Sequence, residues 1–244
     1  MQPYILKGKN ALVTGAARRI GKDISLTLAT EGVNVILHHR NSSKDTEALA
    51  SDLKGLGVNA WVIRADFEKP GEYEKVISGA RFACGSNIDI LINSASIFPE
   101  GTAGDLEWPE LSRNMLVNAW VPFYLGRELA AQSEDGVIIN LLDSRIKDSH
   151  DPSHTAYIIS KKLLESLTLI MARELAPKIR VNAVAPGLIL PPPGKDASYL
   201  ENLTGSVPLK RHGNAEDVAQ AVLMLVRNAF ITGETVFVDG GASL

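Results

Sequence analysis

The stretch "LVTGAARRIG", residues 12–21, decides the fold that this sequence predicts. An apolar run precedes its first glycine and a segment of helical period follows its last, which is the context of a dinucleotide-binding loop. Gly15 permits a sharp turn, and Gly21 permits the helix to pack close to the sheet. The free N–H groups at the start of that helix would face a pyrophosphate. Arg19 stands where a glycine is usual, and a function for this chain has to account for it.

Seven short apolar runs, rich in Val and Ile, follow one another along the chain with segments of helical period between them. They are nearly continuous rather than alternating, as in strands buried on both faces. The pattern predicts an α/β protein: a single-domain Rossmann fold with a doubly wound parallel sheet of about seven strands and helices on both faces. No linker divides residues 1–244, whereas two small α/β units would need a boundary. The runs are residues 10–15, 33–39, 59–66, 88–95, 136–143, 179–187 and 234–241.

The composition narrows the classes of function. The 244 residues are 45% hydrophobic and carry a formal net charge of −3 with no run of like charges, which argues against a nucleic-acid partner. A single cysteine, Cys84, excludes an internal disulfide and a cysteine metal cluster. Neither a signal peptide nor a run of about twenty apolar residues is present. We therefore expect a cytoplasmic protein that acts on a small molecule, without a membrane or a metal.

The second predicted strand ends in "LHHRNSS", which bears on the cofactor. An NAD site has a carboxylate there for the ribose 2′-hydroxyl, and an NADP site has positive charge for the 2′-phosphate. Here no acid follows, and Arg40, helped by Ser42 or Ser43, suits a phosphate dianion. NADPH is the expected cofactor, the alternative being an ordinary solvated loop. Asp66 stands where a side chain could accept from the adenine amino group, and Asn93 ends the fourth strand at the ligand-binding edge.

The segment "HTAYIISKKLLESLTLIMARELAP" predicts a helix on which Tyr157 and Lys161 lie one turn apart. A tyrosine has a pKa of about 10. A nearby ammonium favours the tyrosinate and is expected to lower that pKa, which would make Tyr157 a general acid. Lys162 points about 100° further round the helix.

Together the loop and "YIISK" make the whole chain resemble a short-chain dehydrogenase/reductase. The resemblance extends to "INSAS" where the family shows NNAG, to "VNAWVPF" with Asn118, to "RVNAVAPG" and to the closing "VDGGASL". It implies that Asn118 holds a water in a proton relay behind Lys161, that Lys161 binds the nicotinamide ribose, and that the protein is a homotetramer or a homodimer. The residues expected at the cofactor are Gly15, Arg18, Arg19, Ile20, His39, Arg40, Asn41, Ser42, Asp66, Phe67, Asn93, Ser94, Ala95, Tyr157, Lys161, Pro186 and Gly187.

One position departs from the family pattern. The substrate-binding serine of the family stands thirteen residues before the tyrosine, which is Ser144 here. It also stands three residues past the strand asparagine, Asn140, and that position is Asp143. A loop tolerates an insertion better than a strand tolerates a slip, because a slip reverses every side chain. The register favours Asp143, with Ser144 as the alternative.

Asp143, Arg19 and Phe98 resemble the site of the pteridine reductase branch of the family, which has TGxxxRxG in the loop, aspartate for serine and an aromatic residue after the NNAS-like strand. The resemblance implies that Phe98 stacks on a flat pterin, that Arg19 donates to the pterin and the cofactor phosphate, and that Asp143 assists Tyr157. Two other functions stay open. One is an NADPH-dependent ketoacyl or sugar reductase that uses Ser144, and the other is an NADPH-binding regulatory protein without turnover, which the intact Asn118, Tyr157 and Lys161 argue against.

Overall fold

A computed structural model describes residues 5–147, 153–192, 194 and 196–244. One parallel sheet of seven strands has the order β3-β2-β1-β4-β5-β6-β7, so the direction of winding reverses between β1 and β4. This confirms the predicted fold class. The strands are β1 (Asn10–Thr14), β2 (Asn34–His39), β3 (Ala60–Arg64), β4 (Ile90–Asn93), β5 (Gly136–Leu141), β6 (Ile179–Pro186) and β7 (Thr235–Val238).

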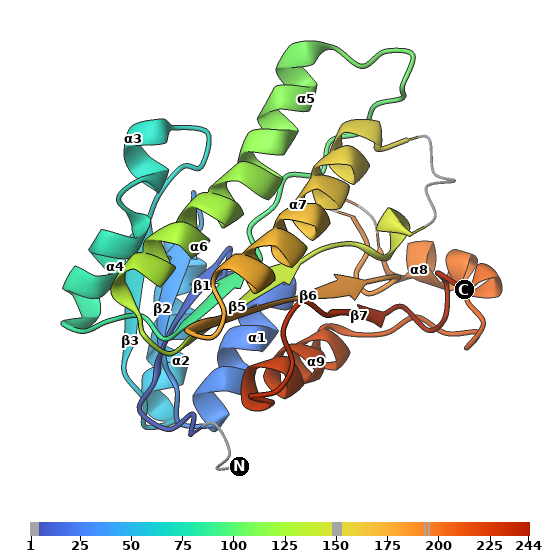
Figure 1. The fold of residues 1–244 in the computed structure, drawn as a ribbon. Coiled ribbons are helices and arrows are strands. Elements are labelled where there is room, and N and C mark those ends of the chain that lie inside the picture. The colour runs from blue at the N-terminus through green and yellow to red at the C-terminus, as the bar shows by residue number, and fades with distance from the viewer. Residues whose placement is uncertain (1–4, 148–152, 193, 195) are drawn as a thin grey trace.

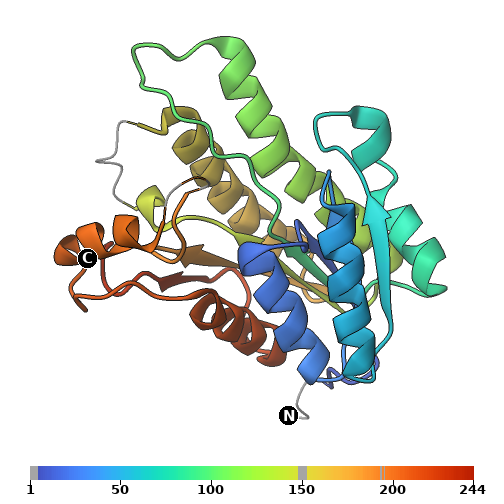
Figure 2. The same cartoon turned by 180° about the vertical axis from the view of Figure 1, so that it is seen from behind.

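Helices cover both faces of the sheet (Figures 1 and 2). On one face α1, α2 and α9 bury apolar side chains against it, and α4, α6 and α7 do so on the other. The α-helices are α1 (Arg19–Thr30), α2 (Ser43–Gly55), α3 (Pro70–Tyr73), α4 (Val76–Cys84), α5 (Trp108–Met115), α6 (Val121–Gln132), α7 (Thr155–Glu174), α8 (Ala197–Leu203) and α9 (Ala215–Arg227).

The inner strands are continuous in apolar residues because both of their faces are covered. All residues of β1, β4 and β5 are buried. Leu12 of β1 and Ile36 of β2 pack against the helices on one face of the sheet, and the next residues, Val13 and Leu37, pack against those on the other face. The interpretation of continuous apolar runs as strands buried on both faces is therefore correct for the inner strands. The edge strand β7 is only half-buried.

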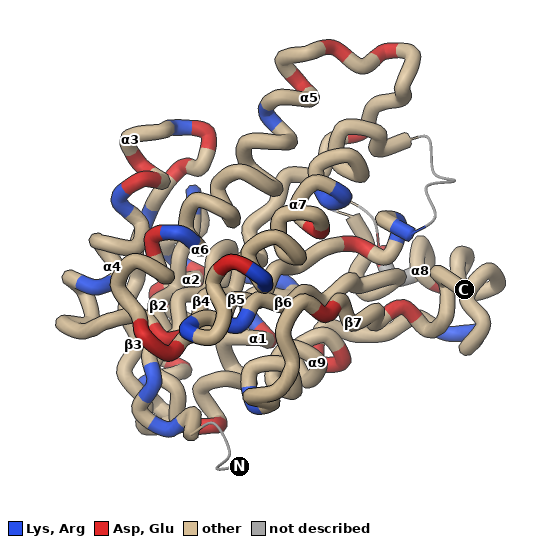
Figure 3. Tube along the Cα trace, in the orientation of Figure 1, with Lys and Arg blue, Asp and Glu red and all other residues tan. Residues whose placement is uncertain are grey.

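A parallel sheet collects the carboxyl ends of its strands at one edge, and ligands bind there beside the point where the winding reverses. In this chain that point lies between Gly15, after β1, and Ser94, after β4. The edge also receives the start of α7, with Tyr157 in its first turn. Figure 3 shows acidic and basic segments interleaved along the described trace, without a stripe of one sign. Within the described ranges, no helix has both the length and the apolarity needed to cross a membrane.

Candidate active site

The loop after β1 is packed so tightly that its glycines cannot be replaced without movement. Gly15 has a φ of +65°, and a Cβ there would lie 2.9 Å from the Cα of Ala95. A Cβ on Gly21 would lie 2.4 Å from the carbonyl oxygen of Gly15. The close contact of Gly21 is thus with the loop itself, and not with the sheet as expected from the motif. Thr14 joins the loop to the next strand, because its Oγ1 accepts from the N–H groups of Ser94 and Ala95, each at 3.0 Å.

Arg19 has a left-handed backbone conformation, which fits a loop position where a glycine is usual. Its φ is +57°, one of two positive values among the described non-glycine residues. Its exposed guanidinium donates to the carbonyl oxygen of Pro191 at 2.9 Å and so connects the loop to the segment after β6. The predicted contacts of Arg19 with a pterin and with the cofactor phosphate stay a prediction. Arg18, beside it, pairs with Asp45 of α2 at 2.5 Å.

His38 holds the same loop from the second strand, and sequence reasoning did not single it out. Its Nδ1 accepts from the N–H of Gly15 at 3.3 Å, and its carbonyl oxygen accepts from the N–H of Ala16 at 3.0 Å. Its Nε2 lies 3.0 Å from the carbonyl oxygen of Ala65, and Phe67 stacks on the ring at 4.4 Å. These partners require a neutral ring with the proton on Nε2. Burial lowers the pKa of His38 from 6.5 to about 4, which agrees with that tautomer.

The predicted 2′-phosphate region is a chain of ion pairs. Arg40 Nη1 donates to Glu68 Oε1 at 2.8 Å, and Arg113 of α5 binds both oxygens of Glu68 at 2.7 and 2.9 Å. The hydrogen bonds from Arg113 lower the pKa of Glu68. Asn41 is exposed and Ser42 half-buried where α2 begins. Glu68 and Arg113 could not be identified from the sequence, because nothing in it places α5 beside the segment that follows β3.

Several expected cofactor residues turn their side chains away from the ligand edge. Phe67 is buried against His38, and Asn93, 2% exposed, donates to Asn140 Oδ1 at 2.9 Å inside the sheet. Their side chains are taken up by the core and the sheet, and the prediction that Phe67 and Asn93 bind the cofactor stays a prediction. Asp66 accepts from the N–H of Glu68 at 3.1 Å in a tight turn.

Three other expected residues, Ile20, Gly187 and His39, are placed by packing rather than by hydrogen bonds from their side chains. Ile20 packs against the core, and a Cβ on Gly187, which follows Pro186, would lie 2.6 Å from the Cβ of Asp239. His39 is buried, which lowers its pKa, and its Nδ1 has no hydrogen-bond partner among the described residues.

Tyr157 meets Asp143 at the end of β5. The tyrosine hydroxyl donates to Asp143 Oδ2 at 3.0 Å, and no hydrogen bond joins it to Ser144 within the described part of the chain. Ser144 is buried and begins a short 3-10 turn, Ser144–Ile146, for which Asp143 is the N-cap. The structure therefore brings Asp143, and not Ser144, to the tyrosine.

The pKa of Tyr157 moves in the opposite direction to the prediction. Burial raises the pKa of Tyr157 well above 10, and the Asp143 carboxylate raises it further. Lys161 lies one turn away, with its Nζ 5.6 Å from the tyrosine ring centroid, but it donates to the carbonyl oxygen of Leu141 at 2.7 Å. Burial lowers the pKa of Lys161 to about 8. The expectation that Lys161 lowers the pKa of Tyr157 is wrong here, because burial and the Asp143 carboxylate raise that pKa and the cation that partly offsets them is Arg145.

An aromatic cluster stands above the tyrosine. Phe98 meets Tyr157 edge to face at 4.6 Å, and His154 stacks on Phe98 at 3.9 Å. Arg145, which was not predicted from the sequence either, lies with its Cζ 5.1 Å from the Phe98 ring centroid. Phe98 is 36% exposed, so part of its surface is open to a ligand.

Asn118 lies in a π-helical turn, Leu116–Trp120, between α5 and α6. Such turns are frequent at functional sites. Its amide is fully buried and donates to Ser160 Oγ and to the carbonyl oxygen of Ile97, both at 3.0 Å. Among the described residues no bond joins Asn118 to Lys161, and the predicted relay between them stays a prediction.

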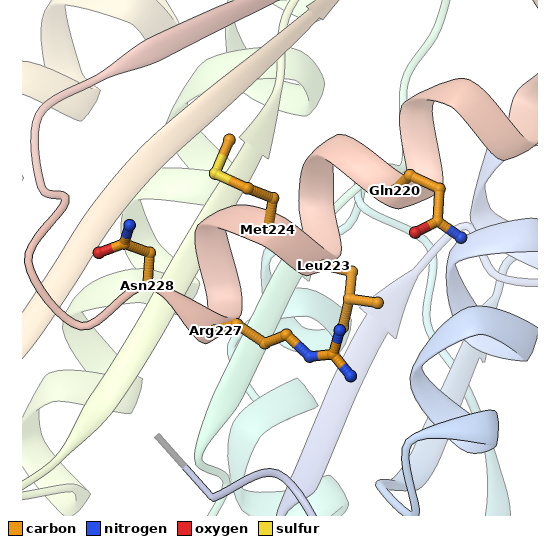
Figure 4. Close-up of a pocket in the computed structure, with 5 residues that line it drawn as sticks. All are labelled: Gln220, Leu223, Met224, Arg227 and Asn228. Atoms are coloured by element: carbon orange, nitrogen blue, oxygen red, sulfur yellow. The ribbon is translucent and has the colours of Figure 1, made fainter. Parts of the chain in front are cut away.

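A pocket of about 360 Å³ lies on α9, lined by Gln220, Leu223, Met224, Arg227 and Asn228 (Figure 4). None of these residues belongs to the predicted site. A second hollow, of about 310 Å³, lies between the start of α1 and α2 and includes Arg18, Arg19 and Asp45.

Comparison with known proteins establishes the family. Residues 15–243 match a family model described as enoyl-(acyl carrier protein) reductase. The curated 3-oxoacyl-[acyl-carrier-protein] reductase FabG of Staphylococcus epidermidis is 34% identical over 241 residues, which span 96% of this chain and 98% of that protein. The solved structure of FolM alternative dihydrofolate reductase 1 from Brucella canis, complexed with NADP, is 33% identical with a TM-score of 0.92, over 98% of this chain and 95% of that one.

A short-chain dehydrogenase/reductase from Serratia marcescens has a TM-score of 0.92 at 31% identity, over 99% of this chain and 100% of that one. This chain therefore belongs to the short-chain dehydrogenase/reductase family of oxidoreductases. The predicted family is confirmed, and the predicted cofactor agrees with the NADP in the FolM structure.

Proposed function

We propose that this protein is an NADPH-dependent reductase of a pteridine-type substrate, of the dihydropterin or dihydrofolate class, with Tyr157 as the proton donor. The observation that carries the proposal is the hydrogen bond from the Tyr157 hydroxyl to Asp143, beside Phe98. A carboxylate accepts from the N–H edge of a heterocycle, which a serine hydroxyl does less well. The similarity to FolM alternative dihydrofolate reductase 1 supports the same choice.

The cofactor assignment has its own support in the chain. Gly15 has a left-handed backbone, and Gly21 has no room for a Cβ. At these two glycines no side chain covers the backbone at the start of α1, which suits a pyrophosphate. Arg18 and Arg40 would bind the 2′-phosphate. Lys161 would bind the nicotinamide ribose, and Pro186 and Gly187 would line the nicotinamide. Bound NADPH supplies the hydride for the ring carbon beside a C=N bond.

The residues of the chain supply the proton and the orientation. The raised pKa keeps the Tyr157 hydroxyl protonated at neutral pH but makes it a weaker acid, so proton transfer needs a positive charge beside it. Lys161, whose pKa is about 8, carries a positive charge at neutral pH and balances the negative charge that Tyr157 gains as it gives its proton to the ring nitrogen. Phe98 offers an aromatic surface to a flat ring.

The test is NADPH oxidation with dihydrobiopterin, dihydromonapterin, dihydrofolate and an acetoacetyl thioester, with Tyr157→Phe as the blank. We expect turnover on at least one pterin, and in the blank a fall in kcat of about 10²- to 10⁴-fold with unchanged NADPH binding. Turnover on the thioester alone would contradict the proposal and return the substrate role to Ser144.

Turnover on the thioester alone would favour the second candidate function, that of an NADPH-dependent carbonyl reductase. The identity of 34% to a 3-oxoacyl reductase favours it. It requires Ser144 to turn toward Tyr157 on substrate binding, and Ser144→Ala separates the two functions. The substitution should leave pterin turnover within about twofold and should cost a carbonyl reductase about tenfold or more.

Arg40→Ala tests the cofactor. Loss of a charge-assisted hydrogen bond to a phosphate should weaken NADPH binding about tenfold or more and leave NADH binding unchanged. Arg81→Ala on α4 is the matched control. Equal losses for both cofactors, measured by titration calorimetry, would contradict the 2′-phosphate assignment.

A further inference from the structure

Glu68, in the turn after β3, binds two arginines in different ways. Arg113 of α5 binds it with a fork, from Nη2 to Oε1 at 2.7 Å and from Nε to Oε2 at 2.9 Å. Arg40 donates to it once, from Nη1 to Oε1 at 2.8 Å. A bidentate pair of guanidinium and carboxylate is stronger and better oriented than a single hydrogen bond. Arg40 is therefore the partner that a ligand can draw away, and Arg113 is the partner that stays.

Arg40 has donors to offer to such a ligand. A guanidinium carries five N–H donors, and within the described residues only the Nη1 of the Arg40 side chain is engaged. The side chain is 45% exposed, so a cofactor can reach it from solvent. It lies between β2 and α2, where an NADP site has its positive charge. Arg40 can thus bind a phosphate oxygen through its remaining donors.

The cations expected at the 2′-phosphate are both paired with carboxylates. Arg18 pairs with Asp45 at 2.5 Å, and Arg40 pairs with Glu68 at 2.8 Å. Taken alone, these four side chains carry no net charge, which leaves little long-range attraction for a phosphate dianion. Arg113 balances the charge of Glu68, so the charge of Arg40 is left for the phosphate.

An unbalanced carboxylate at this place would have the opposite effect. NAD sites have an acidic side chain near the end of the second strand, where it accepts from the ribose 2′-hydroxyl and repels a 2′-phosphate. Glu68 follows the third strand, and its bond to Arg40 brings it to the end of the second. Its charge would therefore favour NADH unless another cation balances it.

We propose that Arg113 is a specificity-determining residue for NADPH over NADH: it neutralises and holds Glu68, so that Arg40 can bind the 2′-phosphate. Arg113 acts through Glu68 and does not touch the cofactor, so it is a positioning residue. When the phosphate binds, Arg40 turns to it and the fork between Arg113 and Glu68 remains. The inference rests on the proposed 2′-phosphate role of Arg40 and not on the pteridine substrate.

The test is calorimetric titration of NADPH and NADH, at low ionic strength, into Arg113→Met, which keeps an apolar stem and removes the fork. NADPH binding should weaken about tenfold, and NADH binding should not weaken. Adenosine 2′,5′-bisphosphate and adenosine 5′-monophosphate differ only in the 2′-phosphate and should show the same contrast. Arg227→Met on α9 is the matched control. The ion pair of Arg227 with Glu31 is about as exposed and lies at the far end of α1, so both cofactors should bind that variant unchanged.

Glu68→Gln, added to Arg113→Met, separates an action through Glu68 from a direct contact with the cofactor. The double variant keeps the charge balance of the unaltered protein, because a cation and a carboxylate are removed together. Its NADPH binding should return to within about twofold of that of the unaltered protein. Arg113→Lys keeps the charge without the fork. It should weaken NADPH binding by about two- to fivefold with NADH unchanged, and it provides the test if the methionine variant does not fold.

Unchanged NADPH binding in Arg113→Met, or equal losses of NADPH and NADH, would overturn the inference. A double variant that binds NADPH no better than Arg113→Met would do so too. These titrations need no substrate and are therefore independent of turnover. The expected losses in a protein that turns over no pterin would contradict the pteridine function and leave the role of Arg113 standing. Turnover of a pterin together with equal losses of both cofactors would do the reverse.

Discussion

Arg19 carries a backbone cost that its side chain has to offset. A non-glycine residue in the left-handed region loses roughly 1–2 kcal/mol, and Arg19 has a φ of +57°. Its guanidinium gains one hydrogen bond, to Pro191. The loop residue that replaces the usual glycine therefore exchanges local strain for a connection to the segment after β6.

Two substitutions separate the backbone strain at Arg19 from the hydrogen bond that its side chain makes. Arg19→Ala and Arg19→Gly both remove the bond to Pro191, but only glycine relieves the backbone. The glycine variant should be more stable than the alanine variant by about 1 kcal/mol in urea unfolding. An alanine variant that equals or exceeds the glycine variant would show that the left-handed backbone is not strained in solution.

His38 makes the stability of the fold depend on pH. Its pKa is about 4 in the folded protein and 6.5 in the unfolded chain, so the unfolded chain takes up a proton first as the pH falls. The contribution is complete above pH 6.5, is lost as the pH falls toward 4, and amounts to roughly 3 kcal/mol. The measurement is the urea midpoint from neutral to acidic pH.

His38→Asn should flatten that profile, because an amide oxygen can accept from the N–H of Gly15 without titrating. His39 also has a lowered pKa and will keep part of the dependence. Ser78→Asn, at an exposed position of α4, adds an amide without removing a titratable group and should leave the slope unchanged. An unchanged slope in His38→Asn would show that His38 is not the source of the pH dependence of stability.

Single residues also mark how far sequence reasoning reached. The strand register led to Asp143, and the structure brings Asp143 to Tyr157. The pKa of Tyr157 could not be derived from its spacing to Lys161, because it depends on burial that other segments provide. The i,i+2 pair of Arg145 and Asp143 could have been noticed in "DSR", but only the fold shows that the pair faces Phe98.

At the scale of elements, the start of α1 is set by close backbone contact. A Cβ on Gly21 would meet the Gly15 carbonyl oxygen at 2.4 Å, and the three nearest atoms, from Gly15 and Ala16, are all backbone atoms that cannot move cheaply. Gly21→Ala should cost about 1–3 kcal/mol of stability and weaken NADPH binding, because the loop and the helix must separate.

Gly79→Ala in α4 is the matched control. A Cβ there meets nothing within 4 Å, so the substitution should stabilise the protein by roughly 0.5–1 kcal/mol through helix propensity alone. Thermal unfolding and NADPH titration of the two variants measure the difference. Equal effects of both substitutions would mean that the loop yields more readily than the contact implies.

Helices and strands were predictable where the hydrophobic period of the sequence is strong, and less so where a candidate functional residue lies in an irregular turn. The helix of Tyr157 was expected from the spacing of its apolar residues, and α7 spans Thr155–Glu174. The π-turn that holds Asn118 was not, because one extra residue in a helix leaves no signal in the hydrophobic period. Likewise, only tertiary packing decides that Phe67 stacks on His38.

At the scale of the whole molecule, the outer face of α7 predicts self-association. Ile159, Leu169 and Ile170 are 39%, 53% and 48% exposed, and Trp120, which precedes α6, is 43% exposed. Exposed apolar side chains in one region mark an interaction site, and soluble proteins most often form symmetric homo-oligomers. The resemblance that predicts a homodimer or homotetramer thus has a surface available for it.

Light scattering after size-exclusion chromatography should give a mass of two or four times the 26.3 kDa chain. Ile170→Asp places a charge on that face and should lower the mass, because an unpaired charge is costly to bury in an interface. Phe82→Asp on α4 is the control: Phe82 is 92% exposed but lies on another helix, and its replacement should leave the mass unchanged. A monomer in the unaltered protein, or a fall in mass with Phe82→Asp alone, would assign the association to a different surface or to none.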